Sequence, residues 1–139
     1  MAWSQGLGER VRKRLVAKVY LDGVLEYITR RFNIPRDKVS IAFEPTIAGV
    51  VRPDLVVMYN GMWFIVEFKT WPNIVYDIEQ VLKFKRVIDE YVKPQHAIPI
   101  LAYVYIAPPQ NIAAIAKGAK PLVVLHLIHG TYRVLYESL

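Results

Sequence analysis

The feature that most restricts the fold of this chain is the segment 51–70, in which two apolar runs flank the pair Asn-Gly at 60–61. Asn-Gly is the pair most favourable for a two-residue type I′ turn, and such a turn between apolar runs predicts a β-hairpin. With that turn, residues whose numbers sum to 121 lie opposite each other. Asp54 is then opposite Glu67 at the open end of the hairpin.

Four charged side chains gather at this open end. Because strand side chains alternate, Asp54, Glu67 and Lys69 point to one face, with opposed Cβ atoms about 5 Å apart. Arg52 is expected opposite Lys69. Buried carboxylates are costly unless they are paired or bind a cation, and Mg²⁺ binds one or two carboxylates while keeping waters for a substrate phosphate. The pattern therefore predicts a Mg²⁺ site, for which Mn²⁺ is a possible substitute. The alternative is a strand end where acids and bases merely pair.

The order Pro-Asp, twelve residues, Glu-Phe-Lys resembles the signature of the PD-(D/E)XK nuclease superfamily, which includes restriction endonucleases and archaeal Holliday junction resolvases. In that family the Asp and the Glu bind Mg²⁺ and the Lys assists the attacking water. The resemblance assigns these roles to Asp54, Glu67 and Lys69. It implies a metal-dependent endonuclease that hydrolyses DNA phosphodiester bonds, on branched or duplex DNA in recombination, repair or restriction. A catalytically inactive nucleic-acid-binding module of the same fold is the alternative, and a purely structural subunit ranks last.

Both faces of the hairpin are apolar, so we expect helices on both sides of the sheet. Hydrophobic periodicity predicts helices over 7–32 and 74–92, a short helix over 109–119, strands over 39–44 and 98–107, and a terminal hairpin over 122–136. With the resemblance, this implies an α/β protein of one domain, residues 1–139, with a restriction-endonuclease-like three-layer αβα core and a mixed central sheet.

The first predicted helix is the expected source of a third metal ligand, because many superfamily members carry an acidic residue there. Glu26, which lies off the apolar stripe, is preferred. Glu9 begins a segment similar to the start of archaeal junction resolvases, but it lies farther from Asp54 in sequence than in that family. An ordinary surface glutamate is the alternative in both cases, and Glu44 is a second-rank ligand. We expect Val11, Leu15 and Val19 to continue the buried stripe, with Gly23 a possible bend or break.

Basic residues point to a polyanionic partner. The net charge is +6 and the isoelectric point is near 9.6, which fits DNA. Arg10 and Arg14 lie in the basic first half of the first predicted helix, and Lys83 lies on the second. We interpret these as contacts to the phosphate backbone, and Arg52 as a clamp on a phosphate near the site.

The segment 77–85 is similar to the Gln-x-x-x-Tyr helix of some restriction-type and recombination nucleases. Gln80 matches the glutamine, whereas Phe84 stands where tyrosine is expected. A role for Gln80 at the site and an ordinary surface position are both open. His126 and His129 are three residues apart on a predicted strand, so they point to opposite faces and are not a chelating pair.

Composition narrows the class of protein further. The chain has no cysteine, which excludes disulfides, a cysteine-ligated zinc and an iron–sulfur cluster. It shows neither a signal sequence nor an apolar run long enough to span a bilayer, so we expect no membrane contact and a cytoplasmic location. Few Asn and Gln with many Val, Ile and Tyr residues are typical of a thermophilic protein. The terminal hairpin offers an edge for a homodimer.

Overall fold

The computed structural model describes residues 2–108 and 111–139. The helices are α1 (Ala2–Phe32), α2 (Ile74–Tyr91) and α3 (Ile112–Ala116), with a 3₁₀ turn, η1, at Arg36–Lys38. The strands are β1 (Ser40–Phe43), β2 (Leu55–Tyr59), β3 (Met62–Lys69), β4 (His96–Val104), β5 (Leu122–Ile128) and β6 (Thr131–Ser138). These agree with the predicted elements to within about five residues at each end, and α3 is shorter than the helix predicted over 109–119. Residues 109–110 of that prediction lie outside the described part.

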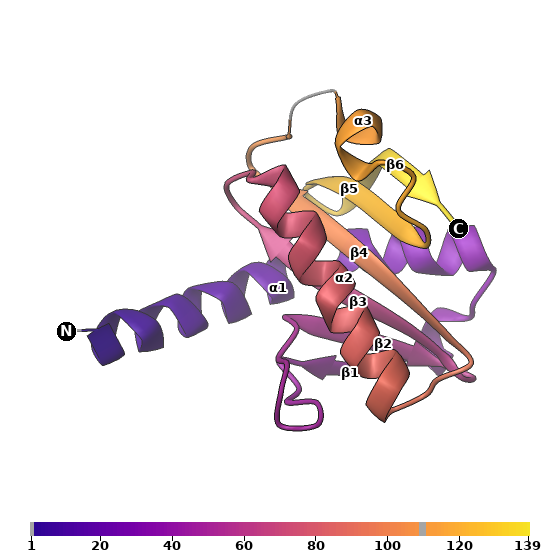
Figure 1. Ribbon diagram of the computed structural model, residues 1–139, viewed down its shortest axis with the longest axis horizontal. Helices are drawn as coiled ribbons and strands as arrows, with labels where there is room; N and C mark the ends of the chain where they lie inside the picture. The colour runs from indigo at the N-terminus through magenta and orange to yellow at the C-terminus, as the bar shows by residue number, and fades with distance from the viewer. Residues whose placement is uncertain (1, 109–110) are drawn as a thin grey trace.

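The strands of the described chain form one six-stranded sheet in the order β1-β2-β3-β4-β5-β6. Strands β1 to β3 are antiparallel, β3 to β5 are parallel, and β6 returns antiparallel to β5. The two parallel connections pass through α2 and α3 (Figure 1). The sheet is therefore mixed, as predicted, and β4 is central.

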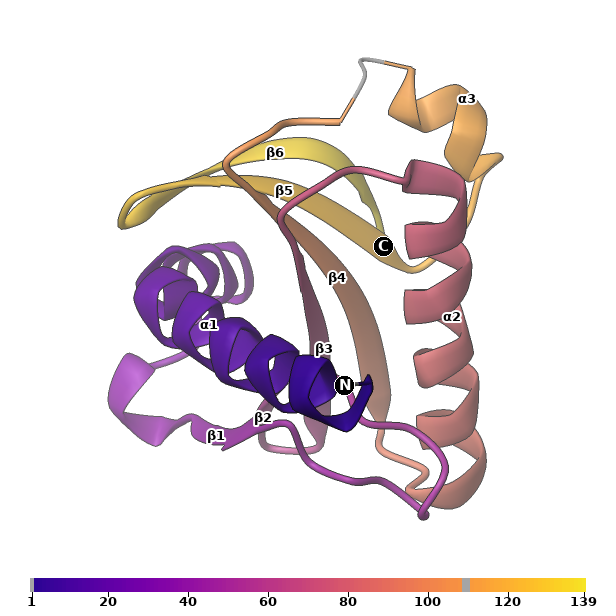
Figure 2. The same ribbon diagram turned by 90° about the vertical axis from the view of Figure 1, so that its left-hand side faces the viewer.

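Helices cover both faces of this sheet. Figure 2 shows α1 on one side and α2 with α3 on the other. The core under α1 contains Leu55, Val57, Phe64 and Val66 of the central hairpin. The opposite face of the same hairpin packs Val56 and Ile65 against α2. The predicted three-layer αβα architecture is confirmed, and the reason is that both hairpin faces are apolar.

The hairpin has the predicted register. Leu55 pairs with Val66 and Tyr59 with Met62, so the paired residue numbers sum to 121. Residues 60 and 61 have φ angles of 50° and 83°, the positive values that a type I′ turn requires. Strand β3 continues to Lys69 because β4 pairs with it in parallel along its whole length, ending at the pair Lys69 and Tyr103.

Helix α1 is continuous through Gly23. A Cβ atom at this position would lie 2.9 Å from the carbonyl oxygen of Thr131, so the glycine allows the helix to approach the β5–β6 hairpin closely. The expectation that Val11, Leu15 and Val19 are buried is wrong, because all three are exposed. The first half of α1 projects beyond the sheet, as Figure 1 shows.

Within residues 2–108 and 111–139, no helix combines the length and the apolar character needed to cross a membrane.

Candidate functional site

The centre of the candidate site is the pair Asp54 and Glu67, which are only 4% and 1% exposed. The Asp54 amide donates a 2.7 Å hydrogen bond to Oε1 of Glu67, and the Phe68 amide donates a 2.9 Å hydrogen bond to Oδ2 of Asp54. These bonds lie one step beyond the last β2–β3 pair, Leu55 and Val66. The two carboxylates are therefore opposite each other, as the register predicts.

Burial makes this pair costly to ionise. Burial and, after it, the charge of the Asp54 carboxylate raise the pKa of Glu67 to about 8. Burial also raises the pKa of Asp54, while the Lys13 ammonium of α1 is the strongest influence lowering it. The folded protein thus binds a proton at the pair near neutral pH. A cation that takes the place of this proton would relieve the same electrostatic cost.

The donor set of the pair suits a hard divalent cation. Mg²⁺ is held in proteins by one or two carboxylates and completes its shell with water or substrate oxygens. Among the residues that the structure describes, no three His, Cys, Asp or Glu side chains are arranged to hold a metal ion. Asp54 and Glu67 match the smaller set that Mg²⁺ needs, with substrate and water supplying the remaining oxygens.

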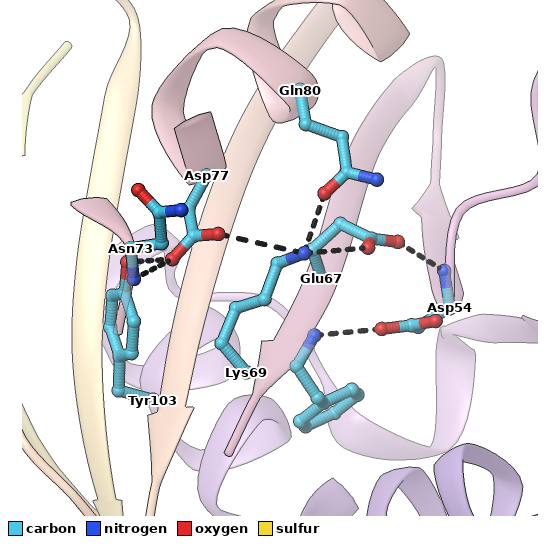
Figure 3. A network of polar contacts seen from close by, with 8 residues as sticks. Asp54, Glu67, Lys69, Asn73, Asp77, Gln80 and Tyr103 are labelled. Carbon is cyan, nitrogen blue, oxygen red and sulfur yellow. Dashed lines mark hydrogen bonds and ion pairs between the residues drawn. The ribbon is translucent and has the colours of Figure 1, made fainter. Parts of the chain in front are cut away.

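Lys69 lies beside the pair, where its ammonium has one hydrogen bond and two carboxylate neighbours (Figure 3). Its ammonium donates a 2.5 Å hydrogen bond to Oε1 of Gln80, and it lies 3.7 Å from Oδ1 of Asp77 and 3.9 Å from Oε2 of Glu67. Asp77 and Gln80 are three residues apart on α2, so both side chains project from the helix face that meets β3. The structure therefore brings Gln80 to the site.

Asp77 is a site residue that the sequence did not reveal. Its Oδ2 atom accepts hydrogen bonds from the Asn73 amide, at 3.0 Å, and from the Tyr103 hydroxyl, at 2.6 Å. The Asn73 side chain makes no capping hydrogen bond, and the Asp77 carboxylate instead binds the free backbone amide at this helix end. The only sequence signal for Asp77 is that it is an acidic residue in the first turn of a helix, three positions before Gln80. Many helices have an acidic residue there, so this signal does not single out a site residue.

The structure places Glu9, and not Glu26, near the site. Glu9 lines a hollow of about 220 Å³ next to Lys69. Glu26 forms an ion pair with Arg30, at 3.4 Å, seventeen residues or about 25 Å farther along the helix. The preference for Glu26 as the helix ligand therefore fails on geometry, because the part of α1 beside Lys69 is its N-terminal half, which carries Glu9 and Lys13.

Arg52 does not face Lys69, so this prediction is wrong. Its guanidinium lies 3.5 Å from Glu44, the proposed second-rank ligand, which is also 3.7 Å from Arg14. The β2–β3 pairing ends before Arg52 because Val51 pairs with Ile47 in a separate small turn. The Glu44 carboxylate is therefore neutralised by arginines.

The predicted phosphate contacts fall on two surfaces. Arg10, Arg14 and Arg52 line one hollow of about 310 Å³ beside the first half of α1. Lys83 lines another hollow on α2, together with Gln80. Phe84 is buried against the sheet and completes the core on this side, so the family's tyrosine hydroxyl has no counterpart there.

No protein-family model matches the chain, and no curated protein matches it in sequence. The fold is similar to that of SPO1766, a protein of unknown function from Silicibacter pomeroyi, with a TM-score of 0.52 and 13% identity over 88% of this chain and 71% of that one. SfsA from Pyrococcus furiosus, solved in complex with Ca²⁺, matches with a TM-score of 0.39 and 16% identity, over 83% of this chain and 61% of that one. At this identity the likeness to SPO1766 concerns the fold alone.

Proposed function

We propose that this protein is a metal-dependent nuclease of the PD-(D/E)XK type that hydrolyses phosphodiester bonds in DNA. The observation that carries the proposal is the opposition of two nearly inaccessible carboxylates, Asp54 and Glu67, with the Lys69 ammonium 3.9 Å from Glu67. A purely structural ion pair has no need of two adjacent buried acids, whose negative charges repel each other. A site that binds a divalent cation and a phosphate does.

In this proposal Asp54 and Glu67 hold Mg²⁺ or Mn²⁺. The bound ion supplies a Lewis acid that activates water and stabilises charge on the phosphate oxygens. Lys69 adds a fixed positive charge beside the reacting phosphate, and it orients the attacking water by donating one of its three N–H bonds. Gln80 and Asp77 fix the ammonium in place for both tasks, because each presents an acceptor oxygen to it.

The DNA partner is supported by the distribution of basic residues around this site. Arg12 and Lys13 line the same hollow as Lys69. Arg10, Arg14 and Arg52 form a second basic surface next to it. Such residues contact the phosphate backbone without regard to base sequence, so we expect binding to weaken steeply as salt is raised.

The test is cleavage of linear duplex, single strand, four-way junction and supercoiled plasmid with Mg²⁺, Mn²⁺ or EDTA. We expect metal-dependent cutting by the wild type and none by Asp54→Asn or Glu67→Gln. Asp89→Asn is the matched control, because Asp89 is an exposed acid near the far end of α2, where it pairs with Lys85. Cutting that survives Asp54→Asn would overturn the proposed site. Binding that persists in EDTA, with no cutting under any metal, would establish the inactive binding module instead.

A further inference from the structure

Three large aromatic side chains are exposed around the mouth of the candidate site. Trp71, Tyr76 and Tyr105 are 72%, 57% and 65% exposed. They come from three different segments, which are the loop after β3, the first turn of α2 and the residue after β4. We call these three residues the aromatic rim.

The topology brings the rim to the end of the sheet where Lys69 lies. Strands β3 and β4 are parallel and their last pair is Lys69 with Tyr103, so Trp71 and Tyr105 each follow that pair by two residues. Trp71 lines the hollow of about 220 Å³ that also contains Lys69. The ring of Tyr76 lies 5.9 Å from the Lys69 ammonium. Trp71 and Tyr76 thus adjoin the Lys69 ammonium, and Tyr105 lies at the same end of the sheet.

Tyr105 is held in its exposed position by the backbone. Its φ angle is 67°, in the left-handed region that is uncommon for residues other than glycine. The Ile106 amide donates a 2.8 Å hydrogen bond to the Val104 carbonyl and turns the chain at this point. The ring packs at nearly a right angle against Tyr20 of α1, with 5.9 Å between ring centroids. The remaining ring surface stays in solvent, although burying it would gain hydrophobic free energy.

The chemistry of the rim fits unpaired nucleobases. Nucleic-acid-binding proteins that take single strands combine a positively charged groove for the backbone with aromatic rings on which bases stack. Arg12, Lys13 and Lys69 supply the charge in the hollow beside Trp71. Lys83 and Arg86 supply it in the hollow beside Tyr76. In a duplex the base faces are already stacked on each other, so a duplex cannot use these rings.

The depth of the carboxylates leads to the same conclusion. Asp54 and Glu67 are almost inaccessible, and the hollow that Lys69 lines beside them measures only about 220 Å³. A strand of a duplex brings its paired partner with it, and a duplex whose major groove alone is about 12 Å wide is too large for this hollow. A single strand can bend into a hollow of about 220 Å³ while its bases stack on the rim.

We propose that the aromatic rim binds unpaired bases, and that the strand cut by this protein is single-stranded at the site, as in a flap, a loop or a frayed end. This inference rests on the proposed nuclease function for the cutting, but the binding stands independently of it.

The experiment measures binding of a fluorescent oligothymidylate and of a hairpin duplex of equal length, both in EDTA so that no strand is cut. We expect the wild type to bind the single strand more tightly than the duplex. Trp71→Ala, Tyr76→Ala and Tyr105→Ala should each weaken single-strand binding by about 5- to 150-fold, the range for loss of one stacked base. Duplex binding should change less than twofold.

Tyr91→Ala is the matched control, because Tyr91 is 59% exposed at the opposite end of α2. It should bind both probes as the wild type does. Trp71→Phe should retain most of the single-strand affinity whereas Trp71→Leu should not, which separates stacking from loss of bulk or of folding. Wild-type preference for the duplex, or rim variants that bind the single strand unchanged, would overturn the inference. If single-strand binding depends on the rings but no DNA is cut, only the proposed nuclease function is refuted. If DNA is cut but single-strand binding does not depend on the rings, only the proposed role of the aromatic rim is refuted.

Discussion

The Tyr103 hydroxyl donates a 2.6 Å hydrogen bond to Oδ2 of Asp77, and the other oxygen of that carboxylate faces Lys69 at 3.7 Å. The same Oδ2 atom also accepts a hydrogen bond from the Asn73 amide. One oxygen of Asp77 is therefore fixed by a strand and by a helix end, which leaves its partner oxygen free to hold the ammonium. Asp77 acts on the proposed reaction through Lys69, so it is a positioning residue.

Replacing Asp77 tests this arrangement. We expect Asp77→Asn to lower kcat for DNA cleavage about 10- to 100-fold with little change in KM, because a hydrogen bond or ion pair to a charged group contributes about 1.5–3 kcal/mol. Tyr103→Phe should lower kcat less, since the Asn73 amide still holds the carboxylate. Glu90→Gln, an exposed acid on the same helix, serves as the control. An Asp77→Asn enzyme with unchanged kcat would show that Lys69 needs no such support.

Glu67 makes the stability of the metal-free protein depend on pH. Its pKa is about 8 in the folded protein against 4.5 in the unfolded chain, because of burial and then Asp54. The folded state binds more protons between these values, so the free energy of unfolding should fall as pH rises from about 4.5 to 8. Urea unfolding in EDTA at pH 5.5, 7 and 8.5 measures this slope. Glu67→Gln should flatten it, and an upward slope in the wild type would contradict the assignment.

Metal binding should release protons, because the cation and the proton compete for the same carboxylates. We expect Mg²⁺ or Mn²⁺ added at pH 7 to acidify a weakly buffered solution of the wild type. The rise in Tm on adding metal should be larger at pH 8.5 than at pH 6, where the cation must first displace the proton. The double variant Asp54→Asn, Glu67→Gln should show neither effect. An equal rise in Tm for that variant would place the metal elsewhere.

Two glycines of α1 allow a test of the close approach between the helix and the β5–β6 hairpin. Alanine is favoured over glycine in helices by about 1 kcal/mol. Gly8→Ala should show this gain, because a Cβ atom there would have no neighbour within 4 Å. Gly23→Ala should instead lower Tm, since its Cβ atom would lie 2.9 Å from a backbone oxygen of Thr131. Thermal unfolding of the two variants gives the comparison. An equal rise in Tm for both would mean that the β5–β6 hairpin moves easily to make room for the added Cβ atom.

The local part of the site could be predicted and the long-range part could not. The opposition of Asp54 and Glu67 follows from a two-residue turn and strand alternation, which depend only on neighbouring sequence. The position of Arg52 depended on a competing pair, Ile47 with Val51, which ends the strand early. The contact between Asp77 and Lys69 depends on where the β3–α2–β4 crossover sets the helix on the sheet, and periodicity carries no information about that placement.

The exposure of Val11, Leu15 and Val19 has a similar cause. Their spacing is that of a buried helix face, yet α1 extends past the edge of the sheet it covers. The spacing of apolar residues in the sequence identifies one face of a helix, but the extent of the neighbouring sheet decides whether that face is buried.

The two-residue turn at 60–61 limits how the spacing between the two carboxylates can evolve. Five residues of each strand and two of the turn separate Asp54 from Glu67. One extra residue in each strand would keep the carboxylates opposite but turn both toward α1, away from Lys69's helix partners. Two extra residues in each strand would return them to the α2 side. With this two-residue turn, the number of residues between the two carboxylates can therefore increase only in steps of four if both are to stay on the α2 side. A relative with fourteen intervening residues must have changed its turn or lost the site.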